Sequence, residues 1–322
     1  MTDEPGPTPA PHVVEAPSAP PTYSLPSATG PPSFEERIYT WFIGSDGLRP
    51  VWRVLLYFAM YRALYFAVGL ALYYVDAAGV GRMRMQMLAE LGVLLAAVIP
   101  GFVMARAERK SLGEFGLPRS QAFGKLFWVG ALWGIAALTL LMLTMHGVGV
   151  FDFGHFALHG PRVLKFAAYY AAFFLLVGFF EEFLLRGYSQ FTLAHGIGFW
   201  PAAIVLSAGF IAFHLSNPGE TVSGLLAVGA IGFFFCLTLR RTGNLWFAVG
   251  FHASWDWGET YLYSVPDSGS MSPGHLLNSS FHGSPWLTGG SAGPEGSLLL
   301  FVLVALLWLA FDRAFPEVKY QG

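Results

Sequence analysis

The chain of 322 residues is 54% hydrophobic and only 12% charged, with a mean hydropathy of +0.52. Soluble domains carry about 25% charged residues, so this composition excludes an ordinary soluble protein and predicts a protein embedded in a membrane. The net charge of -2 indicates neither a nucleic-acid partner nor an acidic substrate, and the single cysteine, Cys236, excludes an internal disulfide and a cysteine-rich zinc site.

The N-terminal segment differs in composition from the rest of the chain. Residues 1–34 contain ten of the 21 prolines, mixed with small and polar residues. Such a segment has few apolar side chains to bury, so we expect a disordered or polyproline II-like tail over residues 1–40. It also lacks the basic start and apolar core of a secretory signal peptide. The remaining residues, 41–322, are predicted to form one membrane-embedded domain.

Eight apolar segments follow the tail, and a helix needs about 20 apolar residues to cross a bilayer. They cover residues 51–75, 84–105, 124–145, 163–191, 199–215, 221–240, 244–263 and 297–315. Backbone polar groups in lipid need partners within the same segment, so we expect helices. The predicted fold is all-α: a polytopic integral membrane protein with about eight transmembrane helices that enclose an intramembrane polar site.

The distribution of basic residues predicts the orientation in the membrane. Lys and Arg flank the connection between the second and third segments and follow the sixth and eighth, whereas residues 264–296 contain none. Because basic loops favour the cytoplasmic side, we expect both termini in the cytoplasm and 264–296 on the opposite side of a bacterial cell membrane. Exceptions to this scheme are Arg82, Arg84, Arg162 and Lys165.

Ionisable side chains lie inside these apolar segments, although each costs roughly 2.5–3.5 kcal/mol near the bilayer centre. In the fourth segment, Glu182 and Arg186 are four residues apart on one helix face, where they can pair. Helix geometry turns Glu181 about 100° away, which leaves a free carboxylate and a candidate base. By itself this motif is also consistent with an ion pair that has no chemical role.

Two more segments carry histidines. His214 lies in the fifth segment, and His252 and Asp256 share a helix face in the seventh. A carboxylate at this spacing can orient an imidazole, or both groups can bind a metal. Each histidine alone could be a hydrogen-bonded packing residue. Together with Glu181 they predict one polar pocket, provided that the fourth helix continues past Arg186.

The three motifs together resemble a known family. Glu181-Glu182-x-x-x-Arg186, Phe210-x-x-x-His214 and His252-x-x-x-Asp256 are similar to the signatures of the CAAX protease and bacteriocin-processing family, and they occur in the same order. The resemblance covers roughly residues 160–260. This family includes the type II CAAX prenyl endopeptidases, which are intramembrane proteases with about eight helices.

The resemblance also implies roles for individual residues. Glu181 would activate a water molecule that His214 holds in place. Glu182 and Arg186 would support the geometry of Glu181. This scheme follows the usual logic of general-base catalysis.

His252 and Asp256 would, by the same resemblance, stabilise the oxyanion formed on the peptide carbonyl. An ionised Asp256 would repel that oxyanion. Asp256 therefore has one of three roles: it is protonated, it orients His252, or it binds a metal. We expect no cofactor, and the alternative is a zinc ion held by Glu181, His214, His252 and Asp256.

The leading hypothesis is an intramembrane endopeptidase that hydrolyses a peptide bond of a membrane-associated or lipidated substrate with Glu-activated water. Its partners would be membrane lipid and a peptide or protein substrate, and no nucleic acid. One alternative is a non-catalytic immunity, scaffold or maturation-partner protein of the same fold. Another is a transporter with a carboxylate proton relay, although we see no pair of interrupted helices in matching halves.

Overall fold

The computed structural model describes residues 33–45, 47–77 and 79–321. The chain forms two compact units, one extending to Arg49 and the other beginning at Pro50. The smaller unit contains helix α1 (Phe34–Phe42) and the antiparallel strands β1 (Ile43–Gly44) and β2 (Gly47–Leu48).

Helix α1 begins at Phe34, inside the range predicted for the N-terminal tail. A capping box starts the helix: Ser33 Oγ accepts from the Glu36 amide at 3.2 Å, and Glu36 Oε2 accepts from the Ser33 amide at 2.7 Å. These contacts satisfy donors that a helix N-terminus otherwise leaves unpaired. The remainder of the predicted tail, residues 1–32, lies outside the described residues.

In the larger unit, helices occupy the predicted apolar segments, which confirms the all-α membrane fold. The main helices are α2 (Pro50–Ala77), α3 (Arg82–Ala107), α4 (Lys125–Gly147), α5 (Pro161–Leu184), α6 (Gln190–Ile197), α7 (Phe199–His214), α8 (Val222–Thr242), α9 (Trp246–Trp257) and α11 (Leu298–Ala314). Two π-helical segments extend α5 and α9, namely η3 (Leu185–Ser189) and η4 (Gly258–Tyr263).

Five of these helical segments are long and apolar enough to cross a membrane: Pro50–Ala77, Arg82–Ala107, Lys125–Gly147, Pro161–Ile197 and Val222–Thr242. The other three predicted spans are also helical but shorter, since α7, α9 and α11 contain 16, 12 and 17 residues. The α9 helix gains a further six residues from η4.

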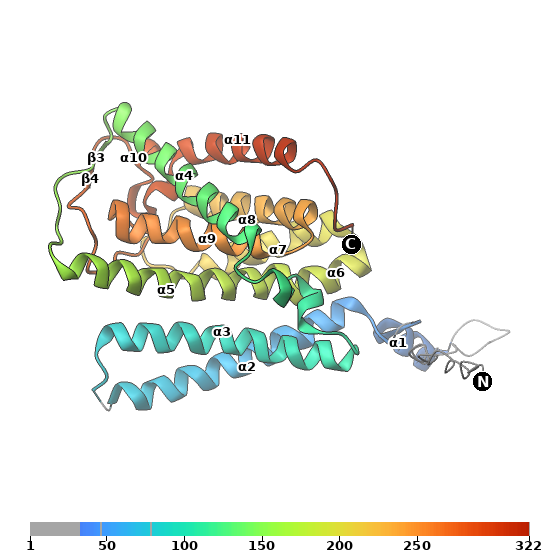
Figure 1. Ribbon diagram of the computed structural model, residues 1–322. Coiled ribbons are helices and arrows are strands. Elements are labelled where there is room, and N and C mark those ends of the chain that lie inside the picture. The colour runs from blue at the N-terminus through green and yellow to red at the C-terminus, as the bar shows by residue number, and fades with distance from the viewer. Residues whose placement is uncertain (1–32, 46, 78, 322) are drawn as a thin grey trace, which may run out of the picture. The chain divides into compact units, whose positions relative to one another are not determined.

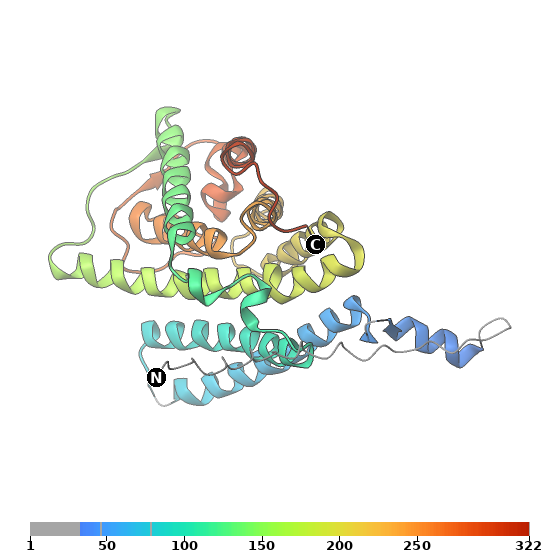
Figure 2. The same cartoon turned by 45° about the vertical axis from the view of Figure 1, so that its right-hand side comes forward.

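Helix α5 occupies a central position in this unit. It packs on one side against α3 of the α2–α3 hairpin and on another against α9, which in turn packs against α4 (Figures 1 and 2). Helix α11 packs against α8 and α4. One buried apolar cluster joins α4, α8, α9 and α11, and a second joins α2, α3 and α5. Helices α5 and α9, which carry most of the predicted site, therefore have neighbours on several sides.

Glycines bring α4 and α9 into close contact. Gly130 and Gly134 are four residues apart on α4, and a Cβ atom at either position would overlap the backbone carbonyl of Phe247 or Phe251 on α9. Gly250 on α9 approaches the backbone of α4 in the same way. Small residues at this spacing let helix backbones approach closely in membrane proteins. This contact sets the position of the helix that carries His252.

The connections at one end of the bundle are also paired. Strand β3 (Phe151–Asp152), which follows α4, is antiparallel to β4 (Ser280–Phe281) in the 264–296 connection. The same connection contains α10 (Pro285–Thr288) and the 3₁₀ turns η5 (Gly290–Ala292) and η6 (Pro294–Gly296). Two more 3₁₀ turns, η1 (Leu112–Phe115) and η2 (Arg119–Gln121), join α3 to α4.

Candidate functional site

The fourth predicted span continues past Arg186, as the sequence argument required. Helix α5 passes through the π-helical segment Leu185–Ser189 into α6, so that helical structure extends to Ile197. Gly187 departs from helical geometry, with φ -79° and ψ -120°, and marks a kink. Single π-helical turns inside α-helices frequently occur at functional sites. This irregular turn contains Arg186.

Glu182 and Arg186 form the predicted ion pair in a fully buried position. Both side chains have 0% exposure, and Arg186 Nη1 lies 3.2 Å from Glu182 Oε1. The guanidinium also lies 4.5 Å from the centre of the Phe210 ring and 5.8 Å from that of Phe235. Cation–π contacts of this kind partly replace the hydration that the guanidinium loses on burial.

His252 lies among three carboxylates. Its Nδ1 is 3.1 Å from Glu182 Oε1, and since a carboxylate can only accept, Nδ1 is the donor. Its Nε2 is 3.5 Å from Glu181 Oε2 and 3.4 Å from Asp256 Oδ2. Glu182 Oε1 thus contacts both Arg186 and His252, which connects the α5 motif to the α9 motif.

His214 is held by its own helix. Its Nδ1 is 3.0 Å from the Phe210 carbonyl oxygen one turn earlier, and a carbonyl oxygen can only accept. Nδ1 therefore carries the proton, and in the neutral ring Nε2 keeps a free lone pair. The Phe210 ring lies edge-on to the imidazole, with 4.7 Å between the ring centres. These contacts fix which nitrogen of His214 is available to a ligand.

A cavity of about 370 Å³ joins the three motifs. Glu181, His214, His252 and Asp256 all line it, together with apolar side chains that include Phe174. Glu182 and Arg186 lie beside it, fully buried. The structure therefore brings the six predicted residues together, four of them at one cavity, while their chemical roles stay predictions.

Sequence reasoning missed several acidic side chains of the same cavity. Glu90 on α3 lines it, as do Asp267 and Glu295 from the 264–296 connection. Glu90 interrupts the apolar second segment, so the argument applied to Glu181 would have found it. Nothing in the spacing of the other two indicates their position. Burial raises the pKa of Asp267 well above its ordinary value, and the negative charges of Asp256 and Glu295 add to this effect.

The four residues predicted as alternative zinc ligands are not the group of metal-binding side chains that lie closest together among the described residues. Among the described residues, the group of His, Cys, Asp or Glu whose ligand atoms all lie within 4.8 Å of one another is Glu259, Asp267 and Glu295. In the predicted set, His252 Nε2 has carboxylate oxygens on two sides at 3.4 and 3.5 Å. Whether a metal binds there stays a prediction.

Comparison with known proteins identifies the central part of the chain. No curated protein and no solved structure matches it. Residues 163–258, which run from α5 to the start of η4, match the family model described as type II CAAX prenyl endopeptidase Rce1-like. All six predicted site residues lie in this range. The match confirms the resemblance seen in the sequence: over residues 163–258 the chain is similar to the type II CAAX prenyl endopeptidases, a family of proteases.

Proposed function

We propose that the chain is an intramembrane endopeptidase that cleaves a peptide bond of a membrane-associated or lipidated substrate, using a water molecule activated by Glu181. The observation that carries this proposal is the cavity between apolar helices at which Glu181, His214, His252 and Asp256 meet. The Rce1-like match supports a protease in general terms.

Glu181 is the carboxylate best placed to act as the base. Its side chain is 20% exposed and lines the cavity, whereas neighbouring Glu182 is fully buried and paired. A water in the cavity could give one proton to Glu181 as it attacks, while its other O–H donates a hydrogen bond to the Nε2 lone pair of His214. General-base catalysis of this kind typically contributes about 10²–10⁴-fold to the rate.

His252 is the group proposed to stabilise the oxyanion. Glu182 accepts from Nδ1 and so fixes the ring with Nε2 toward the cavity. In the doubly protonated ring, Nε2–H could donate to the carbonyl oxygen of the substrate as negative charge develops there. The 3.4 Å contact between Nε2 and Asp256 supports the second of the three roles considered for Asp256, namely orientation of this imidazole.

The contacts of Glu182 and Arg186 favour a role different from the one that the resemblance implies. Glu182 hydrogen-bonds to His252, and Arg186 in turn pairs with Glu182. These two residues therefore support the imidazole of His252 directly, and they act on Glu181 through that imidazole, whose Nε2 lies 3.5 Å from Glu181 Oε2. Hydrogen-bonded partners of this kind orient a catalytic group without touching the substrate.

The walls of the cavity favour an apolar segment of substrate near the scissile bond. Aromatic and aliphatic side chains from α5, α8 and α11 line it, among them Phe173, Phe174, Val177, Ile231 and Leu300. A lipid-modified or apolar peptide would bury these surfaces. We further propose that the protein resides in a bacterial cell membrane with both termini in the cytoplasm, as the basic residues suggest.

The test uses the purified full-length chain in liposomes with farnesylated and unmodified CAAX peptides. Glu181→Gln and His214→Ala should each lower cleavage at least about 100-fold. Asp152→Asn is the matched control, because Asp152 is an exposed carboxylate on strand β3 whose substitution should leave cleavage unchanged. Hydrolysis in ¹⁸O-labelled water should place one ¹⁸O in the new carboxyl group.

Two outcomes would contradict the proposal. Full cleavage by a correctly folded Glu181→Gln protein would exclude Glu181 as the base. Failure of the folded wild-type chain to cleave either peptide, together with complementation of a null strain by Glu181→Gln, would favour the non-catalytic scaffold or immunity function instead.

A further inference from the structure

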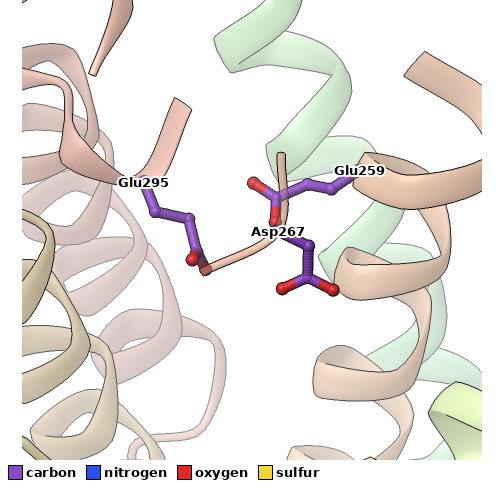
Figure 3. Close-up of side chains that lie close together, drawn as sticks. All are labelled: Glu259, Asp267 and Glu295. Carbon is purple, nitrogen blue, oxygen red and sulfur yellow. The ribbon is translucent and has the colours of Figure 1, made fainter. Parts of the chain in front are cut away.

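A second group of carboxylates lies beyond the proposed catalytic residues. Glu259 from η4, Asp267 from the connection that follows and Glu295 from η6 have ligand atoms that all lie within 4.8 Å of one another (Figure 3). In Figure 3 Glu259 and Glu295 extend toward each other from different segments, and the carboxylate of Asp267 lies below that of Glu259. Three carboxylates this close repel one another unless protons or a cation lie among them.

Glu259 is the member whose surroundings indicate a ligand. Its side chain is fully buried, and neither carboxylate oxygen makes a hydrogen bond of ordinary length to a described residue. The neighbouring Trp255 indole acts on it as a side-chain donor, and this donor is neutral. An ionised carboxylate buried without a partner costs several kcal/mol, so a native structure either keeps it protonated or supplies a compensating charge.

Apart from His252, whose charge acts on Asp267, the protein offers little positive charge at this place. One oxygen of Asp267 accepts from Thr260 Oγ1 at 3.3 Å, and one oxygen of Glu295 accepts from the Ser268 amide and hydroxyl at 3.0 and 2.9 Å. These donors are neutral. Among the described residues that line the adjoining cavity there is no Lys or Arg.

We propose that Glu259, Asp267 and Glu295 bind a calcium ion. Ca²⁺ takes six to eight oxygen ligands in flexible geometry, and three carboxylates with nearby hydroxyls and carbonyls match this preference. Zn²⁺ favours His and Cys ligands, and Mg²⁺ usually keeps several waters instead of a protein cage. Asp267 and Glu295 are only partly buried and line the cavity, which gives the ion a path of entry.

The position of the site suggests what the ion would do. Glu259 follows Asp256 by one turn, and Asp267 and Glu295 lie near the two ends of the 264–296 connection. A bound ion would therefore tie both ends of this connection to the helix that presents His252 and Asp256. This proposal concerns binding and stability, and it does not depend on peptide cleavage.

The experiment measures binding to the full-length chain, purified in detergent and stripped of metal with EGTA. Equilibrium dialysis with ⁴⁵Ca²⁺ should show one saturable site per chain, with a Kd of about 10⁻⁴–10⁻³ M, as in extracellular calcium modules. Glu259→Gln should weaken binding at least tenfold. Glu90→Gln removes a carboxylate that lines the same cavity outside the cluster, and it should change the affinity less than twofold.

Thermal unfolding provides a second readout, because a ligand that binds only the folded state raises Tm. Saturating calcium should raise the Tm of the wild type and of Glu90→Gln, but not that of Glu259→Gln. If Glu259→Gln does not fold, Glu295→Gln at the more exposed side of the cluster replaces it. The proposal is overturned if calcium binding is not saturable, if it survives these cluster substitutions, or if the cluster binds zinc in preference to calcium.

Discussion

Removal of the Arg186 guanidinium tests how the buried charges of the site are balanced. In Arg186→Met the side chain keeps a similar length, but Glu182 loses its cationic partner while remaining fully buried. At the observed 3.2 Å separation and an effective dielectric constant of about 20, the pair attracts by about 5 kcal/mol. The Phe210 contact contributes about 2 kcal/mol when the cation is desolvated. Desolvation of the guanidinium opposes both effects.

We therefore expect Arg186→Met to lower the free energy of unfolding by about 3–5 kcal/mol, the range found when one partner of a buried ion pair is removed. Reversible unfolding in mixed detergent micelles, followed by tryptophan fluorescence, measures this loss. The control is Glu182→Gln, alone and combined with Arg186→Met. Because the two side chains are in contact, the double variant should be more stable than the sum of the single losses predicts, by about 1 kcal/mol or more.

Two results would refute this reasoning. One is an Arg186→Met protein within about 0.5 kcal/mol of the wild type, a change typical of surface substitutions. The other is strict additivity in the double variant. Either would mean that Arg186 does not compensate the charge of Glu182, and the proposed support of His252 would fail with it.

Three further predictions follow from the packing and the chemistry of the site. Gly134→Leu should lower the free energy of unfolding by about 1–3 kcal/mol or more, because the new side chain would meet the Phe251 backbone. The control in the same unfolding assay is Gly147→Leu, since a Cβ atom at Gly147 meets nothing within 4 Å. Tyr188→Phe should lower the free energy of unfolding by about 1.5 kcal/mol in that assay, since it removes a 2.6 Å hydrogen bond to Glu108. A variant as stable as the wild type would contradict this prediction. Peptide cleavage should persist after treatment with a zinc chelator. If the chelator instead removes one zinc per chain and activity falls in step, the zinc site predicted as the alternative is favoured.

Hydrophobic composition and local spacing predicted most of the helical architecture. Helices occupy the apolar segments because lipid leaves the backbone no other partners, and this constraint acts on each segment separately. Local spacing also placed Glu182 beside Arg186 and His252 beside Asp256, since residues four apart lie on one helix face whatever surrounds the helix. The same logic was available for the capping box at Ser33, which the sequence reading overlooked.

The sequence thus determined which segments are helical and which ionisable groups lie within them. Only the tertiary structure decided that Glu182 contacts His252, 70 residues later in the chain, and that Glu259 lies beside Asp267 and Glu295. Contacts between helices depend on how closely their backbones approach and how each is rotated. Those quantities arise from the packing of many side chains at once, as at the glycine contact of α4 with α9, and no local pattern encodes them.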